Sequence, residues 1–216
     1  MPAGLICRTE GGASKKPPRR VEVLEKKRLF EGFLSLDQAV VRYERFDGTM
    51  SEPVTRLSVE RGDAVGVLLF DPGRDQVALV EQFRYPVYAA GDPGWLLEIV
   101  AGTVPRGEDP QAVARAEVRE EAGYEAGELQ PLGTCYLSPG GSSERVHLFV
   151  AHVSIDERAS AGGGVAGEGE DTRLCILGRA EALRLLREGG IVDAKTMVAL
   201  QALFCMGESI GKDAAA

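Results

Sequence analysis

The chain has 216 residues, 44% of them hydrophobic, and a formal net charge of −8 at pH 7. A chain of this length can bury about 70% of its unfolded surface, which predicts one full core with an appendage. The negative charge argues against a nucleic-acid backbone as the main partner, because binding to phosphates requires a basic face. No apolar run reaches the ~18 residues needed to span a bilayer, so no membrane association is expected.

The cysteines and the N-terminal stretch favour a cytoplasmic protein with a disordered tail. The four cysteines lie far apart and form no CxxC pair, so neither a zinc site nor a disulfide framework is predicted, and a reducing cytoplasm fits best. No apolar stretch typical of a signal peptide is present at the N-terminus. Residues 1–20 combine a basic patch with Gly, Pro and Ser, which is typical of a disordered tail.

Residues 21–60 are predicted to form β-strands. Apolar residues alternate with polar ones over 21–24 and 39–43, and a turn is expected at 46–48. This part is too small to hold a core of its own, and its strands cannot bury an apolar face alone. We therefore expect a small N-terminal antiparallel β subdomain that packs against a partner, followed by the main domain over residues 61–210.

The main domain is predicted to be a mixed sheet flanked by helices. Two apolar runs joined by a turn at 71–75 indicate a hairpin. The expected strands are 64–70, 77–83, 95–101, 132–137 and 146–153. Two closing helices are expected at 180–187 and 195–206. Because strands and helices do not alternate regularly, the pattern indicates an α/β sandwich with a mixed sheet.

Three glutamates, Glu117, Glu120 and Glu121, are clustered in a stretch that is expected to be helical. Offsets of three and four residues place their carboxylates on one face of an α-helix. Each like-charged pair destabilises an isolated helix by roughly a few tenths of a kcal/mol, so a cation that offsets the repulsion is expected. Mg²⁺ takes carboxylate, water and phosphate oxygens, which indicates phosphate chemistry. A solvated acidic face is the alternative interpretation of such a cluster.

The residues around this cluster favour metal binding. An acid and a proline at 109–110 predict a helix start, and Gly123 predicts its end. The whole pattern resembles the Nudix box of the Nudix hydrolase superfamily. The matching residues are Gly102, Glu108, Glu117, Val118, Glu120, Glu121, Gly123 and Tyr124. Ala116 departs from the family, which has an arginine there that helps to orient the glutamates, and neither Arg115 nor Arg119 is expected on the same side as Glu117.

Further segments are similar to the ADP-ribose pyrophosphatase branch of the superfamily, of which the GDP-mannose pyrophosphatases are near relatives. These segments are 81–84, 95–102, 138–145 and 163–171. With the box, they extend the resemblance over most of residues 40–205. The resemblance implies a Nudix α/β/α sandwich and a homodimer in which the N-terminal strands are packed or exchanged across the two-fold axis.

The resemblance also implies which residues hold the metal and act on water. Two or three Mg²⁺ ions, or Mn²⁺, would be held by Glu117, Glu120, Glu121 and the Ala101 carbonyl, and Glu121 is counted as catalytic as well. The general base would be a glutamate of the glycine-rich loop, Glu168, with Glu170 as the second candidate. Flexible backbone that carries carboxylates suits a loop that closes over a substrate, although an acidic surface linker has the same composition.

The expected substrate contacts lie outside the box. Arg84 could donate bidentate hydrogen bonds to a phosphate, and the resemblance implies that it contacts phosphate or adenosine. The turn containing Ser138 and Gly140 could bring backbone close to the ligand. A surface arginine and an ordinary turn are the alternatives. By resemblance, Glu144 contacts the nucleoside end, and Arg56 reaches the active site of the partner subunit. The only tryptophan, Trp95, is expected to pack in the core rather than stack on a base.

The implied reaction is Mg²⁺-dependent hydrolysis of the pyrophosphate bond of ADP-ribose to AMP and ribose 5-phosphate, with water as the nucleophile. One alternative is a pyrophosphatase for GDP-mannose, or for nucleoside diphosphate sugars in general, since base selectivity depends on a few contacts. Another is a Nudix protein that senses a nucleotide without hydrolysing it, for which Ala116 is the supporting feature.

Overall fold

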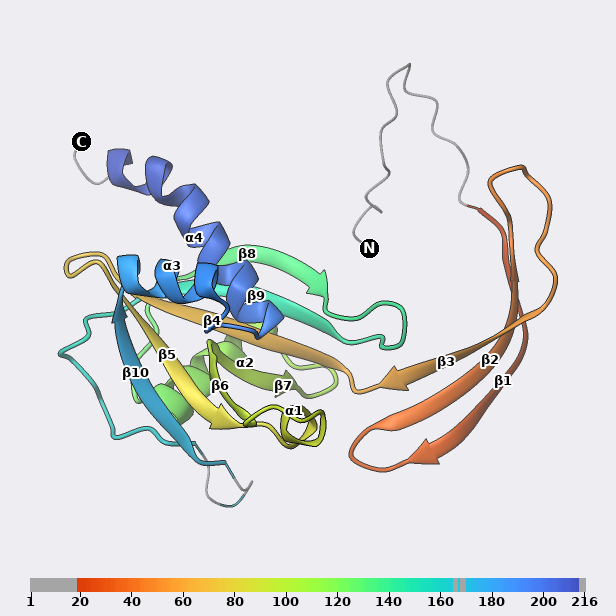
Figure 1. Ribbon diagram of the computed structural model, residues 1–216, viewed down its shortest axis with the longest axis horizontal. Helices are drawn as coiled ribbons and strands as arrows, with labels where there is room; N and C mark the ends of the chain where they lie inside the picture. The colour runs from red at the N-terminus through yellow and green to blue at the C-terminus, as the bar shows by residue number, and fades with distance from the viewer. Residues whose placement is uncertain (1–18, 165–166, 168–169, 214–216) are drawn as a thin grey trace.

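The computed structural model describes residues 19–164, 167 and 170–213, with side chains up to residue 205. The N-terminal part is a three-stranded antiparallel sheet in the order β1-β2-β3. Its strands are β1 (Val21–Glu31), β2 (Ser35–Tyr43) and β3 (Val54–Glu60). This sheet extends away from the rest of the molecule (Figure 1). The expected N-terminal β-sheet is confirmed, whereas nearly all of the predicted tail lies outside the described residues.

The main body is built on a seven-stranded sheet in the order β10-β5-β4-β9-β8, with β6 beside β5 and β7 beside β4. The bounds are β4 (Asp63–Asp71), β5 (Gln76–Phe83), β6 (Trp95–Glu98), β7 (Val100–Val104), β8 (Leu129–Tyr136), β9 (Arg145–His152) and β10 (Thr172–Gly178). Strands β4 and β9 run parallel, whereas the other neighbouring pairs described are antiparallel. The mixed sheet is therefore confirmed.

Helices cover both faces of this sheet (Figure 1). One face carries α2 (Pro110–Glu117) and the π-helix η1 (Val118–Ala122), and the other carries α3 (Arg179–Glu188) and α4 (Ala194–Asp213). A short helix, α1 (Tyr85–Ala89), connects β5 to β6. The arrangement is the expected α/β/α sandwich. No helix in the described part of the chain is long and apolar enough to cross a membrane.

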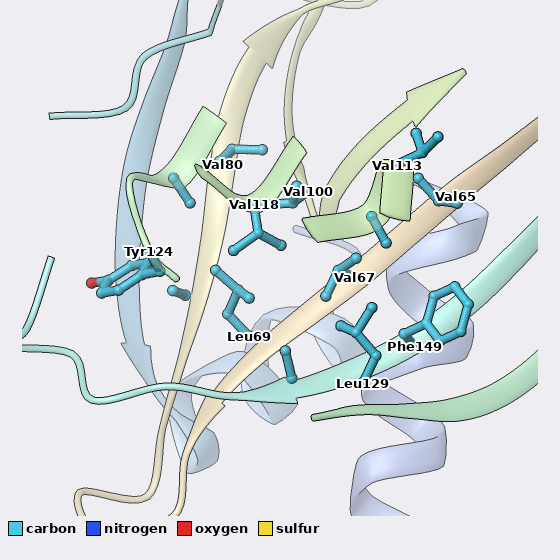
Figure 2. Packing of buried hydrophobic residues seen from close by; sticks show 14 residues of the cluster. Val65, Val67, Leu69, Val80, Val100, Val113, Val118, Tyr124, Leu129 and Phe149 are labelled. Carbon is cyan, nitrogen blue, oxygen red and sulfur yellow. The ribbon is translucent and has the colours of Figure 1, made fainter. Parts of the chain in front are cut away.

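Strand β4 shows why this sequence forms a sandwich. Val65, Val67 and Leu69 pack with α2 and η1 in one core cluster, shown in Figure 2. Leu68 and Phe70 face the opposite way and pack with α3 and α4. Successive side chains of a strand point to opposite faces, so a strand covered on both faces must be apolar throughout. The two faces of β4 therefore hold α2 and η1 on one side of the sheet and α3 and α4 on the other.

Two predictions about residues 95–101 were wrong. The stretch forms two strands, β6 beside β5 and β7 beside β4, rather than one. Trp95 is 54% exposed and contacts the ring of Phe83, with 5.5 Å between the ring centroids. It pairs with Phe83 at the end of β5, and Phe83 itself is 42% exposed. An apolar sequence run therefore did not mean burial along its whole length.

Candidate active site

The acidic motif lies on α2 and η1. Asp109 caps α2 by accepting a hydrogen bond from the Gln111 N–H at 3.4 Å, and Gly123 ends η1 with a φ of 76°. Both helix ends are as predicted, but the last turn is π-helical rather than α-helical. A π-turn holds more residues than an α-turn, and such turns are frequent at functional sites. Glu121 is buried and Glu120 is exposed, so the three carboxylates that were expected on one face differ in their exposure.

Two of the glutamates pack on the backbone of β7. The Ala101 N–H donates a hydrogen bond to Glu121 Oε2 at 3.2 Å. The carboxylate of Glu117 lies so close to Gly102 that a Cβ at this glycine would overlap it. Gly102 thus belongs to the motif for a steric reason, because its missing side chain leaves room for Glu117.

The charge of Glu121 is strongly disfavoured in the metal-free protein. Burial raises the pKa of Glu121 to about 8, and the neighbouring charges of Glu117 and Glu170 act in the same direction. The Ala101 N–H and the Arg84 guanidinium act in the opposite direction on this pKa. A divalent cation would stabilise the charged form of a buried carboxyl that lies beside other carboxylates.

The donor atoms suit a hard divalent metal. The predicted ligands Glu117, Glu121 and the Ala101 carbonyl would supply only oxygen, which Mg²⁺ prefers. Within the described ranges, no three acidic, His or Cys side chains stand close enough together to hold a metal ion. Glu120 lies on the same turn as Glu121 and is exposed. The donor set fits the metal in its chemistry, and Glu117 and Glu121 are already brought together.

The raised pKa predicts how the stability of the metal-free protein depends on pH. Between the ordinary carboxyl pKa of 4.5 and about 8, the folded protein binds more protons at Glu121 than the unfolded chain does. The free energy of unfolding should therefore fall as pH rises through this interval. Melting curves in EDTA from pH 5 to pH 8 would measure this fall, and Mg²⁺ should counter it most at pH 8. A wild-type pH profile identical to that of Glu121→Gln would contradict the prediction.

The glycine-rich segment caps the C-terminal end of the acidic helix. The N–H of Gly163 donates to the carbonyl of Glu121 at 2.9 Å, and the N–H of Gly164 donates to that of Glu120 at 3.1 Å. Arg158 Nε also donates to a carbonyl of the last turn, at 3.2 Å. Helix ends leave such carbonyls without intrahelical partners, and a cation there is favoured by the helix dipole. The segment is therefore attached to the turn that bears the glutamates.

This attachment brings Glu170 to the site. A Cβ at Gly164 would lie 2.7 Å from that of Glu170, so the two residues are packed closely. The charge of Glu170 acts on the pKa of Glu121, which places both carboxyls in one electrostatic neighbourhood. The other predicted base, Glu168, lies outside the described residues.

Arg84, expected at a phosphate, is held by Glu98. Its Nε and NH2 groups donate to the two carboxylate oxygens of Glu98 at 2.8 and 2.9 Å. Lys195 donates to the same carboxylate. Sequence reasoning missed Glu98 and Lys195. The only signal for Glu98 was an acid within an apolar run, and its lysine partner is 97 residues away in the chain.

The predicted nucleoside contacts lie at the end of β3. The Ser138 carbonyl accepts hydrogen bonds from the N–H groups three and four residues later, at 3.1 and 2.9 Å, so the predicted tight turn is confirmed. Gly140 is exposed on this turn. Val59 of β3 donates to a carbonyl of the turn at 2.8 Å, and Glu144 pairs with Arg61 at 3.6 Å. Their roles in substrate binding remain predictions.

Arg56 lies in the N-terminal sheet rather than on the main body. It is exposed on β3, and its NH1 group donates to the carbonyl of Thr55 at 3.0 Å. Strand β3 belongs to the sheet that extends away from the body (Figure 1). The expected role of Arg56 at the site of a partner subunit stays a prediction.

Comparison with known proteins agrees with this geometry. The model of the NUDIX domain matches residues 60–195, which is more than half of the chain. This chain belongs to the Nudix family. Among its Nudix relatives, the ADP-ribose pyrophosphatase of Escherichia coli (strain K12) is 42% identical over 181 residues, which cover 84% of this chain and 86% of that protein. The GDP-mannose pyrophosphatase of Shigella flexneri is 34% identical, covering 86% of this chain and 95% of that protein.

A solved structure described as an ADP compounds hydrolase has the same fold. It matches with a TM-score of 0.70 at 18% identity, covering 92% of this chain and all of that chain. Nudix ADP-ribose pyrophosphatases generally depend on a divalent metal, in agreement with the oxygen donors described above.

Neither neighbouring arginine takes the place of the Nudix-box arginine that Ala116 replaces. Arg115 donates to the carbonyls of Ala126 and Gly127. Arg119 forms a bidentate pair with Glu125, with both donor–acceptor distances at 2.7 Å. Each guanidinium is therefore engaged at the 125–127 loop, as expected from their positions on the helix.

Proposed function

We propose that this Nudix protein is a hydrolase that cleaves the pyrophosphate bond of ADP-ribose, giving AMP and ribose 5-phosphate. The observation that carries the proposal is the packing of Glu117 and Glu121 on β7 at Gly102 and Ala101, with the charge of Glu170 acting on Glu121. A loop carboxylate thus lies within electrostatic reach of the helix glutamates, and metal-assisted attack of water on a diphosphate would use both. The relatives named ADP-ribose pyrophosphatase favour ADP-ribose as the substrate.

The proposed metal is Mg²⁺, with Mn²⁺ as the substitute and two or three ions in each site. Glu117, Glu120, Glu121 and the Ala101 carbonyl would hold it. When bound, such a metal neutralises charge on the pyrophosphate oxygens and lowers the pKa of bound water. Glu168 would orient that water and accept its proton, with Glu170 as the second candidate for this role.

The proposed substrate contacts divide between the two ends of the ligand. Arg84 would donate hydrogen bonds to a phosphate, since its side chain is 36% exposed and its positive charge acts to lower the pKa of Glu121. Glu144 and the turn with Ser138 and Gly140 would contact the nucleoside. These side chains orient the substrate, whereas the helix and loop glutamates act on the bond that breaks.

The protein is also proposed to be a homodimer formed through its N-terminal sheet. All eleven residues of the edge strand β1 are exposed, and its large apolar side chains include Val21 at 64%, Val23 at 61% and Phe30 at 56%. An exposed apolar edge strand is a ready surface for pairing with a second copy. Arg56, on the same sheet, would then reach the partner's active site. We place the enzyme in the cytoplasm, because the described cysteines are free thiols.

The double substitution Val21→Asp/Val23→Asp is expected to convert the dimer into a monomer and to raise KM. Both side chains lie on one face of β1, two residues apart, so two charges on that face oppose burial. Light scattering during size-exclusion chromatography would report the mass. Glu25→Gln, on the same strand, is the control. A fully active wild-type monomer would disprove the proposed assembly.

The activity is tested by following nucleoside monophosphate release from ADP-ribose, GDP-mannose and UDP-glucose with Mg²⁺. Glu120→Gln should lose the activity, whereas Glu128→Gln, an exposed acid beyond the motif, should keep it. AMP release from ADP-ribose well ahead of the other products would support the proposal. Preference for GDP-mannose would assign the protein to the second group of relatives, and binding without release from any substrate would favour a nucleotide sensor.

A further inference from the structure

Beside the acidic site, a buried carboxylate is shared by two cations. Glu98 is 1% exposed, and both of its oxygens accept hydrogen bonds from Arg84. The ammonium group of Lys195 donates to Oε2 of the same carboxylate, and the lysine side chain is itself only 12% exposed. A bidentate guanidinium leaves further lone pairs on a buried carboxylate, and Lys195 satisfies one of them while adding a second positive charge beside Arg84.

Lys195 lies in the first turn of α4, whose N-terminus is fixed by several hydrogen bonds. Asp193 accepts hydrogen bonds from the N–H and the hydroxyl of Thr196, at 2.9 and 2.6 Å, and so caps α4. The same aspartate accepts a hydrogen bond from Lys195 at 2.9 Å. The Thr196 hydroxyl in turn accepts a hydrogen bond from the Ile99 N–H at 2.8 Å, between β6 and β7. The start of α4 is therefore joined to the strands that lead into the acidic site.

The cluster is electrically balanced only with the lysine present. Arg84 and Lys195 carry two positive charges against the two negative charges of Glu98 and Asp193. Arg84 is the more exposed of the two cations, with 36% of its side chain exposed against 12% for Lys195, and its charge acts on Glu121. Its NH1 group makes no hydrogen bond to any residue that the structure describes, whereas Nε and NH2 are bound to Glu98.

We propose that Lys195 is a positioning residue that shares the Glu98 carboxylate so that Arg84 keeps enough positive charge and the right orientation to bind a substrate phosphate. This inference rests on the proposed function, because it takes Arg84 as the phosphate contact. Without Lys195, the positive charge of Arg84 is offset by Glu98, and the negative charge of Asp193 is left unbalanced. The cluster then repels an anionic diphosphate instead of receiving it.

Three variants of the full chain test the inference. Lys195→Met removes the charge at similar length, and Lys195→Arg keeps the charge. Thr196→Val removes the bonds of the hydroxyl to Ile99 and Asp193 without changing any charge. For each, kcat and KM for ADP-ribose are measured with Mg²⁺, the Kd for ADP-ribose is measured by calorimetry in EDTA, and the melting temperature is recorded. Lys195→Gln replaces the methionine variant if the latter does not fold.

Lys195→Met is expected to raise both KM and Kd by about 10-fold, with kcat little changed, as when a supporting partner of a binding group is lost. Lys195→Arg should recover most of the affinity. Thr196→Val should lower the melting temperature and leave Kd unchanged. In an Arg84→Lys background, Lys195→Met should add little further loss, because both act through one contact.

An unchanged Kd in Lys195→Met, with normal hydrolysis by the wild type, would overturn the inference and leave the proposed function intact. A Kd raised equally by Thr196→Val would also overturn it, because loosening of α4 would then account for the effect. Wild-type protein that binds ADP-ribose without hydrolysing it would contradict the proposed function alone, and the Kd series would still decide the role of Lys195. Absence of any binding would overturn both.

Discussion

Replacing Glu121 by glutamine is expected to lower kcat/KM for ADP-ribose by more than about 100-fold, beyond the usual cost of losing an outer-shell partner of a metal. The amide cannot supply an anionic oxygen to a divalent cation. The same substitution should stabilise the metal-free protein at pH 8, because the neutral amide removes the cost of a buried charge beside Glu117 and Glu170. Loss of activity combined with a gain in stability is the distinctive result.

The two effects are measured separately. Steady-state kinetics with Mg²⁺ report the activity, and melting curves in EDTA report the stability of wild type and Glu121→Gln at pH 5 and pH 8. The melting temperatures should differ most at pH 8 and converge toward pH 5, where the wild-type carboxyl is protonated. Glu128→Gln should alter neither quantity. A variant that is less stable at pH 8 and still active would show that Glu121 has a purely structural role.

Gly102→Ala is expected to cost about 100-fold in activity, the size of effect that a displacement of about 1 Å at a reacting site can produce. A Cβ at this position would overlap the Glu117 carboxylate and displace it. Gly102 is not among the described glycines with a positive φ, so alanine can adopt this backbone and the expected loss is assigned to the clash. Kinetics over a range of Mg²⁺ concentrations should show that a higher Mg²⁺ concentration is needed for half-maximal activity, together with a lower maximal rate.

The cause of this loss can be isolated with two further variants. Gly127→Ala is the matched control, because a Cβ there meets no atom within 4 Å, and it should retain activity. Gly102→Ala/Glu117→Ala should melt at a higher temperature than Gly102→Ala, because the shorter side chain relieves the overlap. Equal melting temperatures would mean that the alanine is accommodated without displacing Glu117.

The ends of the acidic helix could be predicted because they depend on local backbone chemistry. Asp109 can accept a hydrogen bond from a first-turn N–H wherever a helix follows, and Gly123 adopts a positive φ at little cost. The mixed sheet was likewise recognisable, since its central strands are continuously apolar. These features depend on residues that are close together in the sequence.

Contacts between distant residues could not be predicted in the same way. The π-turn occurs in a sequence that is equally suited to an α-helix, and its carbonyls are bonded by Gly163 and Gly164, some forty positions later. The pairing of Glu98 with Lys195 spans 97 residues. Family resemblance indicated Arg84 as a site residue, but not the carboxylate that holds it.

The bonds from the glycine-rich segment to the acidic helix tie two parts of the chain into one cooperative unit. The amide protons of Gly163 and Gly164 are held by carbonyls of the turn that bears the glutamates, so they can exchange with solvent only when that turn and the segment separate. Their hydrogen-exchange rates should therefore fall together when a divalent cation stabilises the glutamates. Two backbone amides thus provide a readout of metal occupancy at a site where neither of them is a ligand.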